Sequence, residues 1–312
     1  MKVFFAARDA LWDAWAPSLR AACPEMTLAR SGDLAAGDPA TFDAVIYAPG
    51  WPEDGGAADF APFVNARVVQ SLWAGVERIV GNSTLTQPLC RMVDPGLARG
   101  MVDYCTGWVL RAHLGMDAYA QDGVWRNDLV PPLAAERSVA VLGMGELGRA
   151  VGQALGASGF RVSGWSASGR PVPGIAVQGG AAALDDVLAG AEILVTLLPD
   201  TADTRDLMDA QRLAMLPRGA WLINPGRGTL IDDRALIGAL ESGHLGHAVL
   251  DVFRTEPLPP AHPFWSHPGV TVTPHIAAET RPATAAAVVA DNLRRAMAGQ
   301  PLRYLVDRAR GY

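Results

Sequence analysis

The stretch Ser138–Gly148, with the sequence SVAVLGMGELG, decides the fold of this chain. Its apolar half ends in the pattern G-x-G-x-x-G, and a helical pattern, Glu146 to Ala157, follows at once. In such a turn the first glycine allows a tight bend, the second lets the backbone approach a pyrophosphate, and the third lets helix and strand pack closely. The helix N-terminus then faces the anion. With a strand before it and a helix after it, the pattern predicts a dinucleotide-binding turn rather than an ordinary Gly-rich loop.

The composition excludes several classes of protein. The chain has 312 residues, 50% of them hydrophobic, which suggests about two domains with large cores. A net charge of -6 without a dense Lys/Arg block makes nucleic acid and anionic membranes poor partners. The N-terminal pattern predicts a strand rather than a signal peptide, and no apolar run is long enough to predict a membrane span. The scattered Cys23, Cys90 and Cys105 predict reduced thiols in a cytoplasmic protein and show no metal-ligand spacing.

Alternating strand and helix patterns predict two α/β domains with mostly parallel sheets. The first unit, residues 1 to about 95, has a helical pattern at Ala10–Ala22. Its strand patterns are Lys2–Ala7, Met26–Ala29, Ala44–Ala48 and Val68–Trp73. A long apolar helical run, Leu97 to about Tyr119, should bridge the domains and pack on two neighbours.

The second unit continues the alternation with short apolar strands, which are typical of a sheet buried on both faces. Its strand patterns are Arg161–Trp165, Glu192–Leu198, Ala220–Asn224, Ala248–Val252 and Val270–Thr273, and its helical patterns are Ala182–Leu188, Asp206–Met215 and Asp233–Ser242. A last helix begins near Pro282 and stops before Gly299, so the tail should return to the first domain. The sequence thus predicts a doubly wound βαβ array with right-handed crossovers.

Three ionisable residues come just after strands of the second unit, at the sheet edge where ligands of open α/β sheets bind. Arg227, Glu256 and His275 follow the strands that begin at residues 220, 248 and 270. Each of them alone has an ordinary interpretation: a turn cap, a solvated loop charge and a loop histidine. Their shared position at one edge is what favours a catalytic set.

The set suits hydride transfer to a 2-keto acid. Reduction builds negative charge on the carbonyl oxygen, and a histidine can protonate it near neutral pH. A neighbouring carboxylate favours the imidazolium and orients the ring. The fork of donors on an arginine can pair with the substrate carboxylate and polarise the carbonyl, while a nicotinamide supplies the hydride.

Taken together, these motifs resemble those of the D-isomer-specific 2-hydroxyacid dehydrogenases. The resemblance rests on G-x-G-x-x-G, on Asn-x-x-Arg-Gly at residues 224–228, on LDVFRTEP at 250–257 and on PHIA at 274–277. It covers roughly residue 45 to the end. Within the family, the segments 165–166, 256–260, 280–282 and 306–312 look like the glyoxylate/hydroxypyruvate reductase A group.

The resemblance implies an α/β fold of two doubly wound parallel-sheet domains. A Rossmann-type dinucleotide-binding domain, residues 99–282, would be inserted into a flavodoxin-like substrate domain, residues 1–98 plus 283–312. The implied reaction is the NADPH-dependent reduction of glyoxylate and hydroxypyruvate to glycolate and D-glycerate. The implied assembly is a homodimer that embraces through the helix near Gly100–Tyr119.

The resemblance also assigns roles to residues. Arg227, Glu256 and His275 would be catalytic, with His275 as the proton donor and Arg227 also binding the substrate. The backbone of a loop in the first unit would bind the substrate carboxylate: Trp73, Ala74, Gly75 and Val76. Cofactor contacts would come from Gly143, Met144, Gly145, Glu146, Leu147, Gly148, Trp165, Ser166, Ser168, Arg170, Leu198, Pro199, Thr204, Pro225, Gly226 and, at the nicotinamide amide, Asp251. Trp73 and Glu77 depart from the wider family, which often has Gly and Asp there.

The choice of cofactor follows from the turn after Arg161–Trp165. An acidic residue there would take the ribose hydroxyls of NAD. The chain instead has Ser166, Ser168 and Arg170 and no acid, so a 2′-phosphate meets two hydroxyls and one arginine. NADPH is therefore favoured and NAD remains possible; in the alternative interpretation, Arg170 is only a surface charge.

Two other functions stay open on the sequence. One is a reductase for a different 2-keto acid. The other is a redox-sensing binding protein, a corepressor-like molecule gated by a dinucleotide. The complete set of Arg227, Glu256 and His275 favours an enzyme over a pure sensor.

Overall fold

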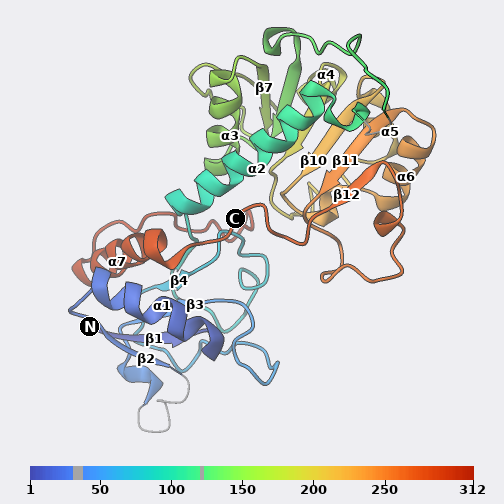
Figure 1. Ribbon diagram of the computed structural model, residues 1–312. Helices are drawn as coiled ribbons and strands as arrows, with labels where there is room; N and C mark the ends of the chain where they lie inside the picture. Colours follow the sequence, from blue (N-terminus) through green and yellow to red (C-terminus); the bar gives the residue numbers. More distant parts are fainter. Residues whose placement is uncertain (31–37, 120–122) are drawn as a thin grey trace. The chain divides into compact units, whose positions relative to one another are not determined.

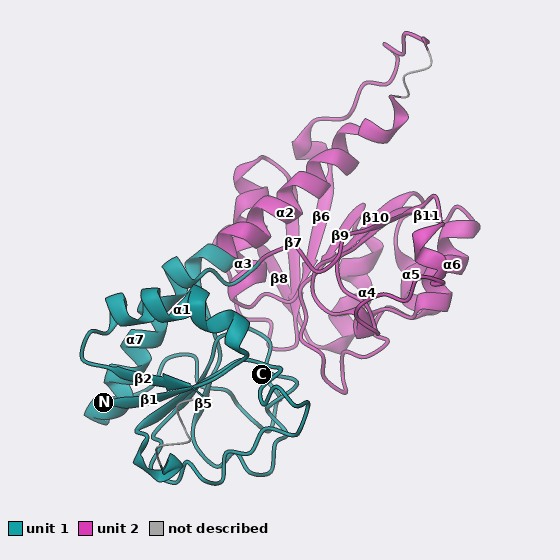
Figure 2. Cartoon of the chain, turned by 60° about the horizontal axis from the view of Figure 1, so that its bottom comes forward, with its two compact units in different colours: residues 1–97, 279–312 teal, residues 98–278 magenta. Residues whose placement is uncertain are grey.

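The computed structural model describes residues 1–30, 38–119 and 123–312 (Figure 1). The chain divides into two compact units (Figure 2). Unit 1 consists of Met1–Leu97 and Glu279–Tyr312, and unit 2 of Ala98–Ala278. Unit 2 is therefore an insertion into unit 1, and the last helix of the chain lies in unit 1.

Unit 1 contains a five-stranded parallel sheet in the order β2-β1-β3-β4-β5. Its strands are β1 (Lys2–Ala6), β2 (Thr27–Arg30), β3 (Ala44–Tyr47), β4 (Val69–Ser71) and β5 (Leu89–Cys90). Its helices are α1 (Asp9–Ala22), α7 (Pro282–Ala298) and the 3₁₀ turn η2 (Pro39–Thr41). This strand order is that of flavodoxin-like folds, which confirms the expected class.

The two faces of the unit 1 sheet are covered differently. Alternate residues of β1, such as Val3 and Phe5, pack with α1 and α7 in one buried cluster. Phe4, on the opposite face, packs against Phe63 at a ring distance of 5.0 Å. The segments that connect β3, β4 and β5 supply half of the apolar side chains on that face.

Unit 2 contains a seven-stranded parallel sheet in the order β12-β11-β10-β9-β6-β7-β8. The strands are β6 (Ser138–Leu142), β7 (Arg161–Ser166), β8 (Ala176–Gly179), β9 (Ile193–Thr196), β10 (Ala220–Asn224), β11 (Leu245–Leu250) and β12 (Val270–Val272). If the strands of unit 2 are numbered 1 to 7 from β6, the order read from β8 begins 3-2-1-4-5-6, which is the Rossmann order. The direction of winding reverses between β6 and β9. The expected Rossmann-type fold is confirmed.

Helices cover both faces of the unit 2 sheet. They are α2 (Pro95–Leu114), which begins in unit 1, α3 (Glu146–Ala157), α4 (Ala181–Ala189), α5 (Ala210–Met215) and α6 (Asp233–Glu241), with the short turns η3 (Met116–Ala118), η4 (Ala134–Glu136), η5 (Gly228–Leu230) and η6 (Pro263–Trp265). Val139 and Val141 of β6 pack with α2 and α3, while Ala140 and Leu142 pack with α4, α5 and α6. Because successive side chains of a strand point to opposite faces, burial on both faces explains the continuous apolar runs.

Several predicted boundaries were wrong. The helix expected at Asp206–Met215 begins only at Ala210, because Asp206 has a left-handed backbone (φ 51°) and Asp209 caps the helix. The helix expected to reach Tyr119 ends at Leu114, where Gly115 is left-handed (φ 61°). The short strands β5 and β8 were not predicted. Among the described residues, no helix is long and apolar enough to cross a membrane.

Candidate active site

The glycine-rich turn lies between β6 and α3, at the point where the strand order reverses. Gly143 has φ 100°, and a Cβ on Gly148 would lie 1.8 Å from the carbonyl oxygen of Gly143, so neither position tolerates a side chain. Gly145 is exposed and a Cβ there would meet no atom within 4 Å. The N-cap residue of α3 is Gly145, which has no side chain to cap the helix. The turn therefore leaves open backbone at a helix N-terminus, which fits the pyrophosphate of a dinucleotide.

The side chains within this turn differ in their surroundings. Met144 is buried, and its sulfur packs where Gly164 of β7 leaves room for it. Glu146 is exposed at the first position of α3 and forms an ion pair with Arg149. That pairing offsets part of the negative charge that Glu146 would present to a phosphate.

The turn after β7 holds the residues expected at the ribose. The Trp165 indole is buried and donates to the carbonyl of Gly180 at 2.9 Å. Ser166 Oγ accepts the N–H of Gly169 at 3.2 Å, which shapes the turn. Ser168 and Arg170 are exposed. These two side chains are therefore open to a ligand phosphate, and Ser166 is partly buried.

In the loop after β9, the Thr204 hydroxyl forms hydrogen bonds with the backbone of the same loop. Thr204 Oγ1 donates to the carbonyl of Pro199 at 2.6 Å and accepts the N–H of Thr201 at 2.9 Å. Leu198 is buried in the core beneath this loop. Thr204 thus shapes the border of the expected adenosine side, and a cofactor contact by Thr204 or Leu198 stays a prediction.

The loop after β10 is organised by Asn224. The buried Asn224 Oδ1 accepts the Thr196 hydroxyl at 2.7 Å and the Gly226 N–H at 3.1 Å, and its Nδ2 donates to the Arg227 carbonyl at 3.0 Å. Pro225 and Gly226 are buried. A Cβ on Gly228 would lie 2.1 Å from the carbonyl carbon of Phe253, so this loop packs closely on the loop after β11. That close approach brings Arg227 to the loop that carries Glu256.

His275 and Glu256 form the centre of the candidate site. His275 Nδ1 lies 2.8 Å from Glu256 Oε2, and the Phe253 N–H donates to Glu256 Oε1 at 2.9 Å. Because a carboxylate only accepts, Nδ1 carries a proton and Nε2 is the nitrogen that titrates. The His275 side chain is 56% exposed, against 29% for Glu256. The ring is therefore held on one side and open to solvent on the other.

The charges around this pair act on its titration. The hydrogen bond that His275 donates to Glu256 raises the pKa of His275. Burial opposes this shift, the charges of Glu256 and Asp251 add to it, and the charge of Arg227 opposes it. Burial pushes the pKa of Glu256 upward, but the hydrogen bonds from His275 and from the Phe253 N–H outweigh it, so the net shift is downward. The arrangement favours a protonated His275 beside an ionised Glu256. The imidazolium is a proton donor suited to neutral pH.

Asp251, at the end of β11, holds the turn that carries His275. Its carboxylate is buried and accepts the Thr273 hydroxyl at 2.6 Å and the N–H groups of Ile276 and Ala277 at 2.9 Å each. Its backbone carbonyl accepts the His275 N–H at 2.9 Å. A contact of Asp251 with the nicotinamide amide stays a prediction; the hydrogen bonds assign it a structural task as well.

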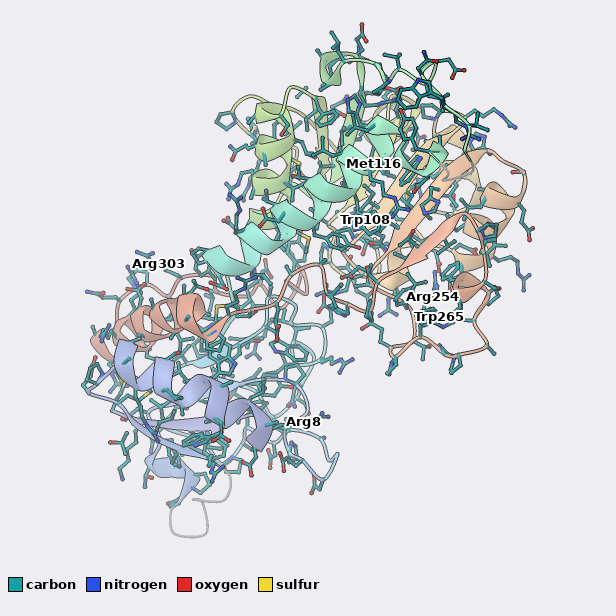
Figure 3. The ribbon with its side chains drawn as sticks, viewed as in Figure 1. Arg8, Trp108, Met116, Arg254, Trp265 and Arg303 are labelled. Carbon is teal, nitrogen blue, oxygen red and sulfur yellow. The ribbon has the colours of Figure 1, made fainter. Side chains whose placement is uncertain are left out.

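Sequence reasoning missed the residues that fix these loops. Arg254 (Figure 3) lies two residues before Glu256, and its guanidinium donates to Asp206 and to the carbonyl of Ile231. Asn224, Thr196 and Thr273 act similarly elsewhere in the site. A polar residue within an otherwise apolar strand pattern, as at Thr196, was the available signal.

The loop expected at the substrate carboxylate lies in unit 1, after β4. The Trp73 N–H already donates to Ser71 Oγ at 3.1 Å, and the Trp73 carbonyl accepts the Met92 N–H at 3.1 Å. Within the part of the chain that the structure describes, the N–H groups that remain for a ligand are those of Ala74, Gly75 and Val76.

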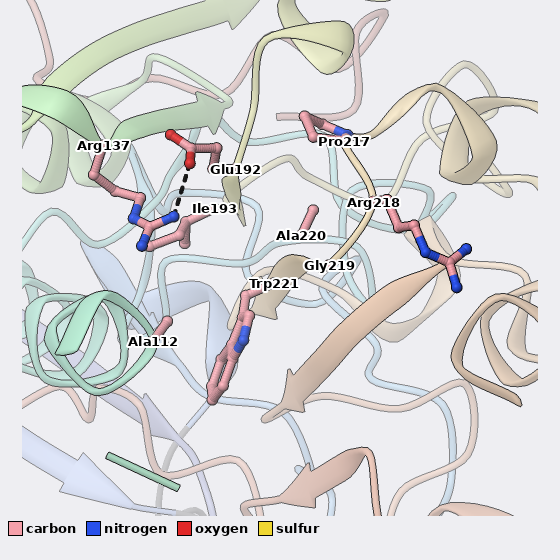
Figure 4. Close-up of a pocket in the computed structure, with 9 residues that line it drawn as sticks. All are labelled: Ala112, Arg137, Glu192, Ile193, Pro217, Arg218, Gly219, Ala220 and Trp221. Carbon is pink, nitrogen blue, oxygen red and sulfur yellow. Dashed lines mark hydrogen bonds and ion pairs between the residues drawn. The ribbon is translucent and has the colours of Figure 1, made fainter. Parts of the chain in front are cut away.

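A small hollow lies at the opposite, amino-terminal end of the unit 2 sheet (Figure 4). Arg137 donates to Glu192 there at 2.7 Å, and Glu192 also accepts the N–H and hydroxyl of Ser138. The rest of its lining comes from Ala112, Ile193 and residues 217–221. The Arg137–Glu192 pair ties the starts of β6 and β9 together.

Comparison with known proteins is consistent with this geometry. A family model described as "D-isomer specific 2-hydroxyacid dehydrogenase, NAD binding domain" matches residues 108–277. Glyoxylate/hydroxypyruvate reductase A of Serratia proteamaculans is 41% identical over 254 residues, which is 78% of this chain and 81% of that protein. A D-isomer specific 2-hydroxyacid dehydrogenase from Xanthobacter autotrophicus Py2, solved with NADPH and MES, superposes with a TM-score of 0.90 at 39% identity, covering 100% of this chain and 99% of that one. The NADPH-dependent glyoxylate/hydroxypyruvate reductase of Sinorhizobium meliloti, solved with NADP and sulfate, gives a TM-score of 0.88 at 34% identity, with 100% and 99% covered.

Proposed function

This chain belongs to the D-isomer-specific 2-hydroxyacid dehydrogenase family and is an NAD(P)-dependent oxidoreductase, and we propose that it reduces glyoxylate and hydroxypyruvate with NADPH. The products are glycolate and D-glycerate. The observation that carries the proposal is the hydrogen bond of 2.8 Å between His275 and Glu256 at the carboxyl edge of the unit 2 sheet, beside Arg227. Relatives named for this reaction support the choice of substrates.

In this proposal, His275 is the proton donor. A bound nicotinamide supplies the hydride to the carbonyl carbon. His275 Nε2 gives its proton to the carbonyl oxygen, while Glu256 stabilises the imidazolium before transfer and orients the ring through Nδ1. Arg227 pairs with the substrate carboxylate and polarises the carbonyl. In the reverse direction, neutral His275 accepts the hydroxyl proton.

NADPH is the proposed cofactor, in preference to NAD. The open backbone at Gly145 and the uncapped N-terminus of α3 suit the pyrophosphate. The exposed Ser168 and Arg170 suit a 2′-phosphate, since the turn holds no carboxylate to repel it. Solved relatives in complex with NADPH or NADP support this preference. We further propose that residues 99–282 form the dinucleotide-binding domain and that residues 1–98 plus 283–312, including the loop Trp73–Val76, form the substrate domain.

A homodimer is also part of the proposal. Large apolar side chains just beyond α2 are exposed, including Met116 (Figure 3), Val124, Trp125, Val130 and Leu133. Trp125 alone is 87% exposed. Large apolar side chains exposed close together in the sequence are typical of a protein interface, so they support an embrace that involves the helix near Gly100–Tyr119. Light scattering should report twice the mass of one chain, and a monomer at assay concentration would overturn this part. The cytoplasmic location stays a prediction.

The decisive experiment measures NADPH oxidation spectrophotometrically with glyoxylate, hydroxypyruvate, pyruvate and a bulkier 2-keto acid. We expect the highest kcat/KM with the first two. A clear preference for another acid would change the substrate but keep the reaction class. Tight NADPH binding without turnover of any acid would overturn the proposal and favour the dinucleotide-gated binding protein.

A further inference from the structure

Three polar side chains connect helix α2 to the turn that carries His275. The Tyr104 hydroxyl lies 2.8 Å from Thr273 Oγ1, and Thr273 Oγ1 lies 2.6 Å from Asp251 Oδ1. Tyr104 is half-buried in α2, while Asp251 is buried at the end of β11. In such surroundings a hydrogen bond is stronger than in water, and an unpaired polar group is costly.

Counting protons shows which group is the donor in each of these two hydrogen bonds. Asp251 accepts the Ile276 N–H at Oδ1 and the Ala277 N–H at Oδ2, each at 2.9 Å, as an acceptor-only carboxylate does. The single hydroxyl proton of Thr273 is therefore donated to Asp251. Tyr104 must then be the donor to Thr273, so the order is Tyr104 to Thr273 to Asp251.

The turn that carries His275, next to Asp251, has an unusual backbone conformation. His275 has φ 57°, a left-handed backbone that a non-glycine residue keeps only where its surroundings hold it. Its N–H donates to the backbone carbonyl of Asp251 at 2.9 Å, and the next two N–H groups donate to the Asp251 carboxylate. The conformation of this turn, and with it the direction of the ring, depends on where the Asp251 carboxylate lies.

We propose that Tyr104 and Thr273 are positioning residues that hold the His275 ring against Glu256 by fixing the Asp251 carboxylate. The inference rests on the proposed function insofar as His275 is the proton donor. Neither hydroxyl needs to touch substrate or cofactor for this effect. A residue of helix α2, 171 positions before His275, thereby controls the geometry of the acid group.

The consequence can be read from the titration of His275. Glu256 and Asp251 raise its pKa, and Arg227 and burial oppose them. A loosened turn lengthens the hydrogen bond to Glu256, which is the largest of these influences. Loss of either hydroxyl should therefore lower the pKa of His275. It should also lower kcat by about tenfold, because small misplacements of a reacting group slow the reaction.

The test uses two substitutions that remove a hydroxyl, with matched controls. Tyr104→Phe and Thr273→Val interrupt the series of hydrogen bonds from Tyr104 to Asp251, whereas Thr273→Ser keeps a hydroxyl at the same place. Tyr119→Phe removes another tyrosine hydroxyl of unit 2, one that donates to the Leu129 carbonyl at 2.7 Å and is unconnected to Asp251. NMR titration of the full-length protein measures the His275 ring, whose signal is the one missing from His275→Asn.

We expect a lowered His275 pKa in Tyr104→Phe and Thr273→Val, and values close to wild type in Thr273→Ser and Tyr119→Phe. In the double variant Tyr104→Phe/Thr273→Val, the His275 pKa should fall no further, because one substitution already interrupts the series of hydrogen bonds. An unchanged pKa in both chain-breaking variants, or an equal fall in Tyr119→Phe, overturns the inference. Because the titration needs no turnover, it decides the inference even if the wild-type protein oxidises no NADPH, a result that would overturn only the proposed function.

Discussion

The two ends of the unit 2 sheet each hold an acid–base pair at nearly the same distance. At the carboxyl end, His275 lies 2.8 Å from Glu256; at the amino end, Arg137 lies 2.7 Å from Glu192. Glu192 is satisfied by Arg137 and by two donors from Ser138. At the carboxyl end, no described group hydrogen-bonds to His275 Nε2.

Distance alone therefore does not identify a reactive pair. Arginine stays charged at every physiological pH, so the amino-end pair can only brace the strands. Histidine titrates near neutrality, and the ring at the carboxyl end can pass its Nε2 proton to a ligand. Substitutions at the carboxyl end should therefore change the reaction rate, and substitutions at the amino end should change the stability.

The largest expected effect is that of removing the proton donor. His275→Ala should lower kcat by roughly 10²–10⁴, the usual share of general acid–base catalysis, and leave NADPH binding nearly intact. Because His275 has φ 57°, His275→Asn is the better matched variant, since asparagine tolerates this backbone. Steady-state kinetics and NADPH titration measure both quantities.

The control for this prediction lies at the amino end. Glu192→Gln removes the charge of the bracing pair, so the melting temperature should fall while kcat stays within about twofold. The contrast between the two ends would be lost if Glu192→Gln slowed turnover as much as His275→Asn does. Near-normal kcat in a folded His275→Asn protein would remove His275 as the donor.

The second effect concerns the geometry of Arg227. Arg227→Lys keeps the positive charge but loses the bidentate fork, so kcat/KM should fall by more than about tenfold, since a charged hydrogen bond is worth roughly 1.5–3 kcal/mol. Arg218→Lys, at the amino-end hollow, is the matched control and should leave kcat/KM unchanged. An unaltered kcat/KM in Arg227→Lys would mean that Arg227 only braces its loop.

The contrast between the ends also shows what the sequence could predict. Strand order and the positions of Arg227, Glu256 and His275 follow from local patterns, because residues after parallel strands meet at one edge. The fixing contacts do not follow from local patterns. Tyr104 and Thr273 are 169 residues apart, and the left-handed Asp206 that binds Arg254 lies inside what looked like a helix. Such pairs are set by tertiary packing, which no sequence window contains.

A smaller effect is expected at the ribose side of the carboxyl edge. Arg170→Ala should raise the KM for NADPH several-fold and leave the KM for NADH almost unchanged. Because Arg170 is exposed, added salt should reduce the difference between wild type and variant. Kinetics with both cofactors at two ionic strengths measure it, with Arg170→Lys as the variant that keeps the charge. Equal weakening with both cofactors would show that Arg170 does not read the phosphate.

The smallest expected effect is a displacement of the pH profiles in Glu256→Gln. The carboxylate of Glu256 raises the pKa of His275, so the charge-free variant should have a lower one. Reduction needs protonated His275, and its rate falls as pH rises through that pKa; its alkaline limb should therefore move to lower pH. Oxidation needs neutral His275, so its acid limb should move to lower pH as well. The measurement is kcat/KM against pH in both directions, with Glu192→Gln as the control that keeps both limbs in place. Limbs that stay fixed, or that move in opposite directions, would show that Glu256 does not tune His275, and the two ends of the sheet would then differ less than their geometry indicates.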